Sequence, residues 1–276
     1  MTLLKNTQVE IIKDSKPRGQ IRFAIFDFDG TISILREGWQ DVMQAMMIEF
    51  LQPAPDCEEE GALSATVKEA IDVSTGRQTI YQMIALRNMV LARGGEAQEA
   101  KAYKAIFNTR LLAHIAHRVE GVRSGLIAPE SMMVPGSLKI LDEMRERRVA
   151  CFLASGTDQP YVLAESAALG VDVYFDEIYG ALDDYQNYSK RMVIERIIQE
   201  NDLYGAELVG FGDGFVEIED VNAAGGIAVG VASDEVNRKG VNKWKRERLV
   251  KAGADVIIPD FQECENVVSW LFDKEG

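Results

Sequence analysis

Short, nearly continuous apolar runs recur along this chain, and each one ends in small, polar or acidic residues. The runs lie at residues 21–26, 149–154, 207–211, 226–231 and 255–258. A short apolar run bounded by turn residues is typical of a strand buried on both faces of a parallel sheet. Intervening stretches such as 137–147 and 190–199 carry apolar residues at helical spacing. The alternation predicts right-handed βαβ units and a doubly wound parallel α/β sheet.

Polar residues follow the ends of three of these runs. Asp27 comes directly after the first run, Ser155 after the second, and Asp213 just beyond the third. In doubly wound sheets, ligands bind outside the carboxyl ends of the strands. The three side chains are therefore expected to meet at one edge of the sheet.

Residues 36–132 have a different character, because they contain no comparable apolar runs. Their apolar residues recur at helical spacing instead, as in Met43, Met46 and Met47. This pattern predicts a helical insertion over 36–132, placed between two parts of a core formed by 1–35 and 133–276. For residues 1–19 two interpretations stay open, an extra strand or a loose arm.

The composition narrows the class of protein. The chain has 276 residues, with 30 Lys and Arg against 44 Asp and Glu, for a formal net charge of −14. Such an acidic chain is expected to avoid nucleic acids and anionic membranes. Its three cysteines are widely spaced, as expected for free thiols in a reducing cytosol. With no apolar run of about 18 residues, the expected location is cytoplasmic.

The pair Asp27 and Asp29 carries the strongest chemical signal. Two carboxylates at the end of a buried strand repel each other unless a cation compensates them, and their hard oxygens suit Mg²⁺. One such carboxylate can attack a phosphoryl group while the other manages the proton of the leaving group. The alternative interpretation is a solvated Asp-x-Asp-Gly turn.

Four segments, in chain order, resemble the motifs of the haloacid dehalogenase superfamily. They are Asp27-Phe28-Asp29-Gly30-Thr31, the strand that ends at Ser155-Gly156, Ser189-Lys190 at a helix start, and Gly212-Asp213-Gly214 with Glu217. The resemblance spans about residues 20–272. It implies a Rossmann-like core with an inserted all-α cap of the C1 type, as in phosphoglycolate phosphatase and β-phosphoglucomutase-like proteins.

The resemblance also implies a role for each matching residue. Asp27 would be the nucleophile and Asp29 the general acid and then base. Mg²⁺ would be held by the carboxylates of Asp27 and Asp213 and by the Asp29 backbone carbonyl. Ser155 and Lys190 would bind the phosphoryl oxygens. The expected phosphate-binding set is completed by Phe28, Thr31 and Gly156.

Two departures from the family pattern leave questions open. Lys190 is followed by Arg191 rather than by the frequent proline, so either basic residue could fill the third motif. Glu217 stands where an aspartate is usual, and it would either reach the metal through water or hold Lys190. The acid at Asp29 is a feature of the phosphatases and phosphomutases of the superfamily, and Thr31 fits the same branch.

Two other basic features allow a functional and a bland interpretation. Arg77, beside Gly76 in the insertion, could grip a second phosphate or sugar hydroxyls of the substrate, or it could belong to a polar connection between helices. The basic run over 238–251, which includes Lys245, is expected to be a solvated helix face.

Three functions are consistent with these motifs. The first is a Mg²⁺-dependent phosphatase that hydrolyses a small phosphorylated metabolite, such as a sugar phosphate, through an aspartyl-phosphate. The second is a phosphomutase of the β-phosphoglucomutase type, which excludes water. The third is a regulatory protein that keeps the fold without turnover. The sequence leaves the oligomeric state and the natural substrate undetermined.

Overall fold

A computed structural model describes residues 2–4, 7–182, 189–202 and 205–273 of the chain. The chain divides into two compact units, which are described separately. The first unit comprises Met1–Glu37 with Arg118–Gly276, and the second comprises Gly38–His117. Residues 118–132, which follow the second unit in the chain, thus belong to the first unit.

The first unit is built on one mostly parallel sheet with the strand order β1-β2-β8-β7-β6-β3-β4-β5. The strands from β8 to β5 all run parallel, whereas β1 and β2 add antiparallel pairs beside β8. The predicted doubly wound α/β fold is confirmed. The strands are β1 (Thr2–Leu3), β2 (Glu10–Ile11), β3 (Phe23–Phe26), β4 (Ala150–Asp158), β5 (Glu177–Ala181), β6 (Leu208–Gly212), β7 (Ile227–Val231) and β8 (Val256–Ile258).

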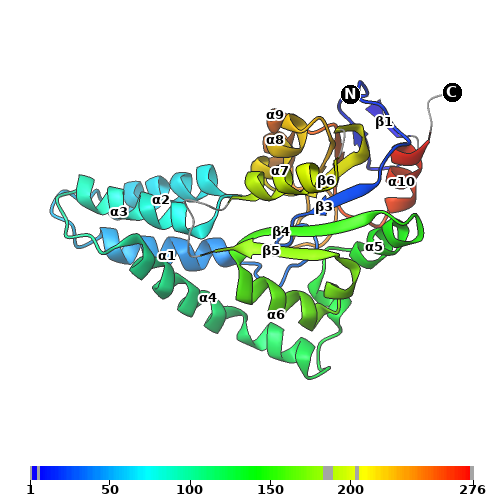
Figure 1. Ribbon diagram of the computed structural model, residues 1–276. Coiled ribbons are helices and arrows are strands. Elements are labelled where there is room, and N and C mark those ends of the chain that lie inside the picture. The colour runs from blue at the N-terminus through cyan, green and yellow to red at the C-terminus, as the bar shows by residue number, and fades with distance from the viewer. Residues whose placement is uncertain (1, 5–6, 183–188, 203–204, 274–276) are drawn as a thin grey trace. The chain divides into compact units, whose positions relative to one another are not determined.

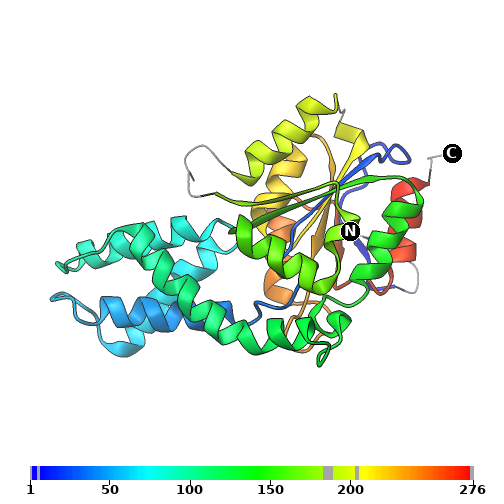
Figure 2. The same cartoon turned by 60° about the horizontal axis from the view of Figure 1, so that its bottom comes forward.

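Helices cover both faces of this sheet, which explains the continuous apolar runs. Alternate residues of β3 enter two different cores: Ala24 and Phe26 pack on one side, Phe23 and Ile25 on the other. The first face is covered by α5 (Ser137–Glu146), α6 (Gln159–Leu169) and α10 (Cys264–Phe272). The second is covered by α7 (Lys190–Glu200), α8 (Phe215–Ala223) and α9 (Lys243–Ala252), which lie together in Figure 1. Figure 2 shows α5 and α10 side by side on the first face.

Two parts of the sheet go beyond the predicted runs. Strand β5 is an edge strand whose residues Glu177–Tyr179 are partly or largely exposed, so it lacks a continuous apolar run. At the amino terminus, β1 and β2 are short strands, in line with one of the two interpretations of residues 1–19. Strands at or near the edges of the sheet thus carry a weaker hydrophobic signal than the central ones.

The second unit is helical. It contains α1 (Trp39–Leu51), α2 (Glu60–Ser74), α3 (Thr79–Ala92) and most of α4 (Ala100–Arg123). The first three helices contact one another through apolar side chains, among them the buried Met43, Met46 and Met47. The methionine stripe is thus core. Three short 3₁₀ helices complete the described elements of the chain, at Pro129–Met132, Asp172–Tyr174 and Gly205–Glu207.

None of the described helices combines the length and the apolar character needed to cross a membrane.

Candidate active site

The Asp27–Thr31 string forms a tight turn directly after the central strand β3. The carbonyl of Phe28 accepts hydrogen bonds from the backbone N–H groups of Ile32 at 2.9 Å and Ser33 at 2.8 Å. Gly30 has a φ of +77°, and a Cβ at this position would lie 2.2 Å from Oδ2 of Asp213. Only glycine fits here, both for its left-handed backbone and for the closeness of the Asp213 carboxylate.

Asp27 lies at the centre of a buried charge cluster. Its backbone N–H donates to the carbonyl of Phe211 in the neighbouring strand β6, which fixes the end of β3. Its Oδ1 accepts a hydrogen bond from Nζ of Lys190 at 2.7 Å, and the same ammonium binds Glu217. All three side chains are at most 7 % exposed. Asp27 and Glu217, which come from different parts of the fold, therefore meet at the ammonium of Lys190.

The start of each helix explains how Lys190 and Glu217 reach Asp27. Ser189 caps α7, because its hydroxyl accepts the backbone N–H of Met192, and Lys190 is the first residue of that helix. Glu217 lies in the first turn of α8, next to β6. In a doubly wound sheet, helices begin at the edge where the preceding strands end, so both first turns face the Asp27 turn.

Burial and charge set the protonation of this cluster. Burial raises the pKa of Asp27 well above its ordinary value, and the carboxylates of Glu217 and Asp213 add to the rise, whereas Lys190 opposes it. Burial alone would lower the pKa of Lys190, but its ion pairs with Asp27 and Glu217 raise it above the ordinary value. Lys190 therefore stays protonated, as expected for an ammonium between two acids.

Asp29 has different partners. Its Oδ2 accepts hydrogen bonds from the Thr157 hydroxyl at 2.7 Å and from the Ser155 hydroxyl at 3.4 Å. Its buried Oδ1 has no hydrogen-bond partner in the described part of the chain, and Nε of Arg36 lies 3.8 Å away. Burial raises the pKa of Asp29 to about 6, against the lowering effect of Arg36. Asp29 is thus poised to exchange a proton near neutral pH.

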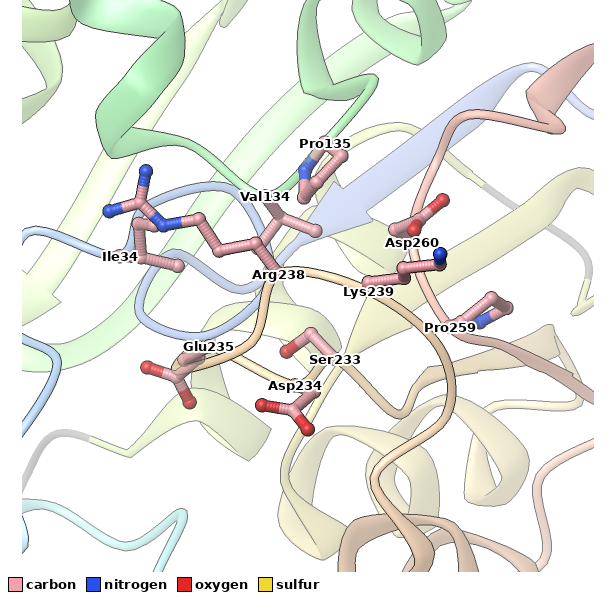
Figure 3. Close-up of a pocket in the computed structure, with 10 residues that line it drawn as sticks. All are labelled: Ile34, Val134, Pro135, Ser233, Asp234, Glu235, Arg238, Lys239, Pro259 and Asp260. Carbon is pink, nitrogen blue, oxygen red and sulfur yellow. The ribbon is translucent and has the colours of Figure 1, made fainter.

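Asp213 is paired with a second buried lysine. Nζ of Lys245, from the first turn of α9, lies 2.7 Å from Oδ2 of Asp213 and 2.6 Å from Glu235. It also donates to the hydroxyl of Ser233, which donates to the carbonyl of Gly30 at 2.6 Å. Figure 3 shows Ser233 and Glu235 on the loop after β7, where both line a pocket. Burial alone would lower the pKa of Lys245, but the ion pairs of Lys245 with Asp213 and Glu235 raise it above its ordinary value.

Lys245 corrects one expectation from the sequence. The basic run over 238–251 was expected to be a solvated helix face, but Lys245 is only 6 % exposed. Its neighbour Arg246 is partly buried and binds Glu10 of β2. The tertiary fold places acids next to both Lys245 and Arg246. The expectation failed because the charge pattern of one helix does not show which acids the rest of the fold brings to it.

The other predicted site residues fall into three groups. Gly156 lies between Ser155 and Thr157 at the end of β4, so it shares the edge of the sheet with Asp27 and Asp29. Phe28 and Thr31 are fully buried, and the Thr31 hydroxyl has no hydrogen-bond partner among the described residues. Arg77 is an exposed residue of the second unit, in the connection between α2 and α3.

The two candidates for the third motif lie on different sides of α7. Lys190 is buried against Asp27, whereas the side chain of Arg191 is 65 % exposed and pairs with Glu195 one turn along the same helix. Glu217 binds Lys190. Of the two basic residues, only Lys190 is in contact with Asp27 in the structure.

Sequence reasoning missed four side chains that surround the predicted residues. Thr157 had a usable signal, because residues two apart in a strand point to the same face, as Ser155 and Thr157 do. No such sequence signal marked the other three, Arg36, Glu165 and Lys245, since each comes from a segment without a motif. Nε and Nη2 of Arg36 donate to Glu165 at 2.9 Å and 2.6 Å.

Within the residues described, no group of three or more His, Cys, Asp or Glu side chains is arranged to hold a metal ion. The set predicted for Mg²⁺ differs from such a group, because it contains two carboxylates, of Asp27 and Asp213, and one backbone carbonyl. Asp213 raises the pKa of Asp27, as expected for two carboxylates that interact across the Asp27–Thr31 turn.

A doubly wound sheet with a cluster of acids and lysines at the carboxyl ends of its central strands defines the class of protein. The chain belongs to the haloacid dehalogenase-like hydrolases, whose family model matches residues 21–225. No curated protein matches the sequence.

Solved structures of similar fold include enzymes of two kinds. A predicted phosphoglycolate phosphatase from Haemophilus somnus has a TM-score of 0.58 and 14 % identity, with 90 % of this chain and 98 % of that one covered. A β-phosphoglucomutase from Clostridium difficile has a TM-score of 0.59 and 14 % identity, with coverage of 91 % and 98 %. A predicted phosphatase from Clostridium acetobutylicum has a TM-score of 0.60 and 15 % identity, with coverage of 93 % and 100 %. At these identities the likeness establishes the shared fold.

Proposed function

We propose that this protein is a Mg²⁺-dependent phosphatase that hydrolyses a small phosphate monoester, such as a sugar phosphate, through an aspartyl-phosphate on Asp27. One observation carries the proposal: two acids from a single turn have separate environments suited to separate tasks. Asp27 is held by the Lys190 ammonium at 2.7 Å, whereas Asp29 has a pKa of about 6 and an Oδ1 that makes no hydrogen bond to the described residues. Membership of the hydrolase family agrees with this division.

The first half of the reaction forms the covalent intermediate. A carboxylate oxygen of Asp27 attacks the phosphorus, and the bond from phosphorus to the ester oxygen breaks. Asp29, in its protonated form, gives its proton to that oxygen as the alcohol leaves. Lys190 stabilises the negative charge of the phosphoryl oxygens, because its ammonium stays protonated beside Asp27 and Glu217.

The second half returns the enzyme to its starting state. The Asp29 carboxylate takes a proton from a water molecule as the water oxygen attacks the phosphorus. The bond from phosphorus to Asp27 breaks, which releases inorganic phosphate and regenerates both acids. One buried carboxyl whose pKa lies near neutrality can serve as acid and then as base.

Mg²⁺ fits the oxygen donors of this turn. The carboxylates of Asp27 and Asp213 and the carbonyl of Asp29 would hold the ion, since hard oxygen ligands suit it. When bound, Mg²⁺ would neutralise charge on the transferring phosphoryl group. Lys245, which now pairs with Asp213, has Glu235 as a second acceptor, so its ammonium keeps a partner when Asp213 binds a metal.

Substituting the nucleophile tests the proposed function. Purified wild type and Asp27→Asn are incubated with Mg²⁺ and a panel of phosphate monoesters that includes 4-nitrophenyl phosphate, and released phosphate is measured. We expect the variant to lose at least about 10³-fold in rate, since an amide is a poor nucleophile. Asp41→Asn, at an exposed position in the first turn of α1, is the matched control and should keep full activity.

Three results would contradict the proposal. Full activity of Asp27→Asn would remove Asp27 as the nucleophile, and hydrolysis that persists after chelation would remove Mg²⁺. With a hexose 1-phosphate and a trace of its bisphosphate, isomerised product without free phosphate would identify a phosphomutase instead.

A further inference from the structure

Arg36 and Glu165 form a buried ion pair next to Asp29 that the proposed catalytic steps do not use. Arg36 follows the Asp27–Thr31 turn, and Glu165 lies in α6. Their exposed fractions are 8 % and 3 %, and the guanidinium donates two hydrogen bonds to the carboxylate. A buried ion pair is weak evidence for a role in stability, because desolvation offsets much of its attraction.

Two side chains of α6 lie next to the guanidinium of Arg36. Glu165 binds it with both oxygens, and the ring of Tyr161, one turn earlier on the same helix, lies 5.7 Å from its Cζ. A planar guanidinium held this way keeps a single orientation. The position of the Arg36 guanidinium beside Asp29 is thus set by α6.

The two carboxyl oxygens of Asp29 differ in their contacts with neighbouring side chains. Oδ1 of Asp29 is 3.8 Å from Nε of Arg36, too far for a hydrogen bond, whereas Oδ2 is bound by the Thr157 hydroxyl at 2.7 Å. One oxygen of the carboxyl is therefore anchored, and the other makes no hydrogen bond to the described part of the chain. The charged side chains that act on Asp29 from the packed elements are Arg36, Glu165 and Lys190.

We propose that the Arg36–Glu165 pair positions Asp29 for proton transfer, with Glu165 as the tether that keeps Arg36 from binding Asp29 directly. This inference rests on the proposed phosphatase function. Because Nε and Nη2 of Arg36 both donate to Glu165, the guanidinium attracts Oδ1 of Asp29 without capturing it. Oδ1 then stays available for the proton that passes to the leaving alcohol. Arg36 and Glu165 are positioning residues, since each acts through Asp29.

The dependence of the rate on the leaving group tests this positioning role. A nitrophenolate leaves with little proton transfer, whereas an alkoxide needs a proton from Asp29. For Glu165→Gln, which weakens the tether, we expect kcat/KM to fall about 100-fold on an alkyl phosphate and less than about threefold on 4-nitrophenyl phosphate. Arg36→Lys, which keeps the charge but not the two-point contact, should show the same pattern more weakly.

Glu10→Gln is the matched control. Glu10 forms a similar two-point pair with Arg246, with Nη2 to Oε2 at 2.6 Å, and it lies in β2 away from the Asp29 cluster. The control should change the rates on both substrates equally, whatever it does to the melting temperature. The double variant Arg36→Met/Glu165→Met, which removes both charges of the pair together, covers the case in which a single variant fails to fold.

The outcomes separate the two proposals. Equal losses on both substrates in folded Glu165→Gln or in the double variant would overturn the positioning role and leave a structural one. A wild type that hydrolyses neither substrate would overturn the proposed function, and the inference with it.

Discussion

The surroundings of Asp27 and of Asp29 differ sharply, although the two residues are separated by only one position. Asp27 contacts the ammonium of Lys190, and the carboxylates of Glu217 and Asp213 lie nearby. Asp29 contacts the hydroxyl of Thr157 and lies near the guanidinium of Arg36, which is itself paired with Glu165. Partners from distant segments, and not the Asp-Phe-Asp string itself, give two identical side chains these different surroundings.

The two carboxyls differ in how closely a cation approaches them: Nζ of Lys190 lies 2.7 Å from Oδ1 of Asp27, whereas Nε of Arg36 lies 3.8 Å from Oδ1 of Asp29. Burial raises the pKa of both carboxyls, and at Asp27 the directly bonded ammonium opposes this rise, because a nearby opposite charge favours the ionised form. Pairs of acids whose environments differ in this way are typical of acid–base and nucleophilic chemistry in one site. The predictions below change one side of the comparison at a time.

The largest effect is expected on the Asp27 side, from Lys190→Met. The variant leaves Asp27 and Glu217 buried without their shared cation, which should cost about 3–5 kcal/mol in the free energy of unfolding. The rate should also fall by about 10²–10³, as expected when a charged donor to the phosphoryl oxygens is removed. Urea unfolding and phosphate release measure the two effects.

Arg191→Met is the control for Lys190, because Arg191 follows Lys190 in the first turn of α7 but faces solvent and pairs with Glu195. It should leave both the rate and the stability nearly unchanged. If Arg191→Met is the damaging variant and Lys190→Met is harmless, the assignment of Lys190 to the third motif is wrong.

A smaller effect is expected on the Asp29 side, from Thr157→Val. The Thr157 hydroxyl donates to Asp29 and lowers its pKa, so its loss should raise the pKa of Asp29 above the present value of about 6. As a proton donor, Asp29 works below its pKa, so kcat/KM for an alkyl phosphate falls as pH rises through that value. In the variant this fall should occur at higher pH, with the maximal rate reduced by about tenfold.

The pH profile of kcat/KM checks this shift, and Thr109→Val is its control. The hydroxyl of Thr109 is exposed on α4 and donates to the carbonyl of Ala105. Its removal should not move the profile. A profile of Thr157→Val that is unchanged, or moved to lower pH, would show that the hydroxyl does not stabilise the ionised form of Asp29.

The smallest effect concerns Asp220, an acid at the border of the Asp27 cluster. Burial raises its pKa to about 6, and Glu217 adds to the rise. The folded protein thus binds this proton more tightly than the unfolded chain, so stability falls as pH rises from about 4 to about 6. Asp220→Asn should remove this cost and stabilise the protein above pH 6 by about 1 kcal/mol, once solvent screening is allowed for.

Urea unfolding at pH 4 and at pH 7.5 measures this difference, with Glu219→Gln as the exposed control on the same helix. The gain from Asp220→Asn should be present at pH 7.5 and absent at pH 4, where the carboxyl is protonated in the folded state. A gain of the same size at both pH values would be a helix effect rather than an electrostatic one.

The sequence was informative wherever a residue is dictated by local geometry. Continuous apolar runs predicted the central strands, because these are buried on both faces, and the edge strand β5 escaped for the opposite reason. The turn at Gly30 was predictable as well, because a chain that bends there needs a left-handed residue. The positions of Asp27, Asp213 and Lys190 at element ends followed from the same logic. Their roles in catalysis stay predictions.

Several charged side chains around these acids were not predictable. Arg36, Glu165 and Lys245 are ordinary charged residues in sequence, and most such residues lie at the surface. Each is buried here because the fold brings an opposite charge to it: Glu165 to Arg36, and Asp213 with Glu235 to Lys245.

The sequence by itself determined the doubly wound sheet, the family, and the edge of the sheet where the acids gather. These follow from hydrophobic periodicity and from turn residues, which are properties of short segments. Only the tertiary structure decided which cation faces which acid, because ion pairs such as Lys190 with Asp27 join residues far apart in the chain. Protonation depends on burial and on charges within a few ångströms, and both exist only once the helices have packed onto the sheet.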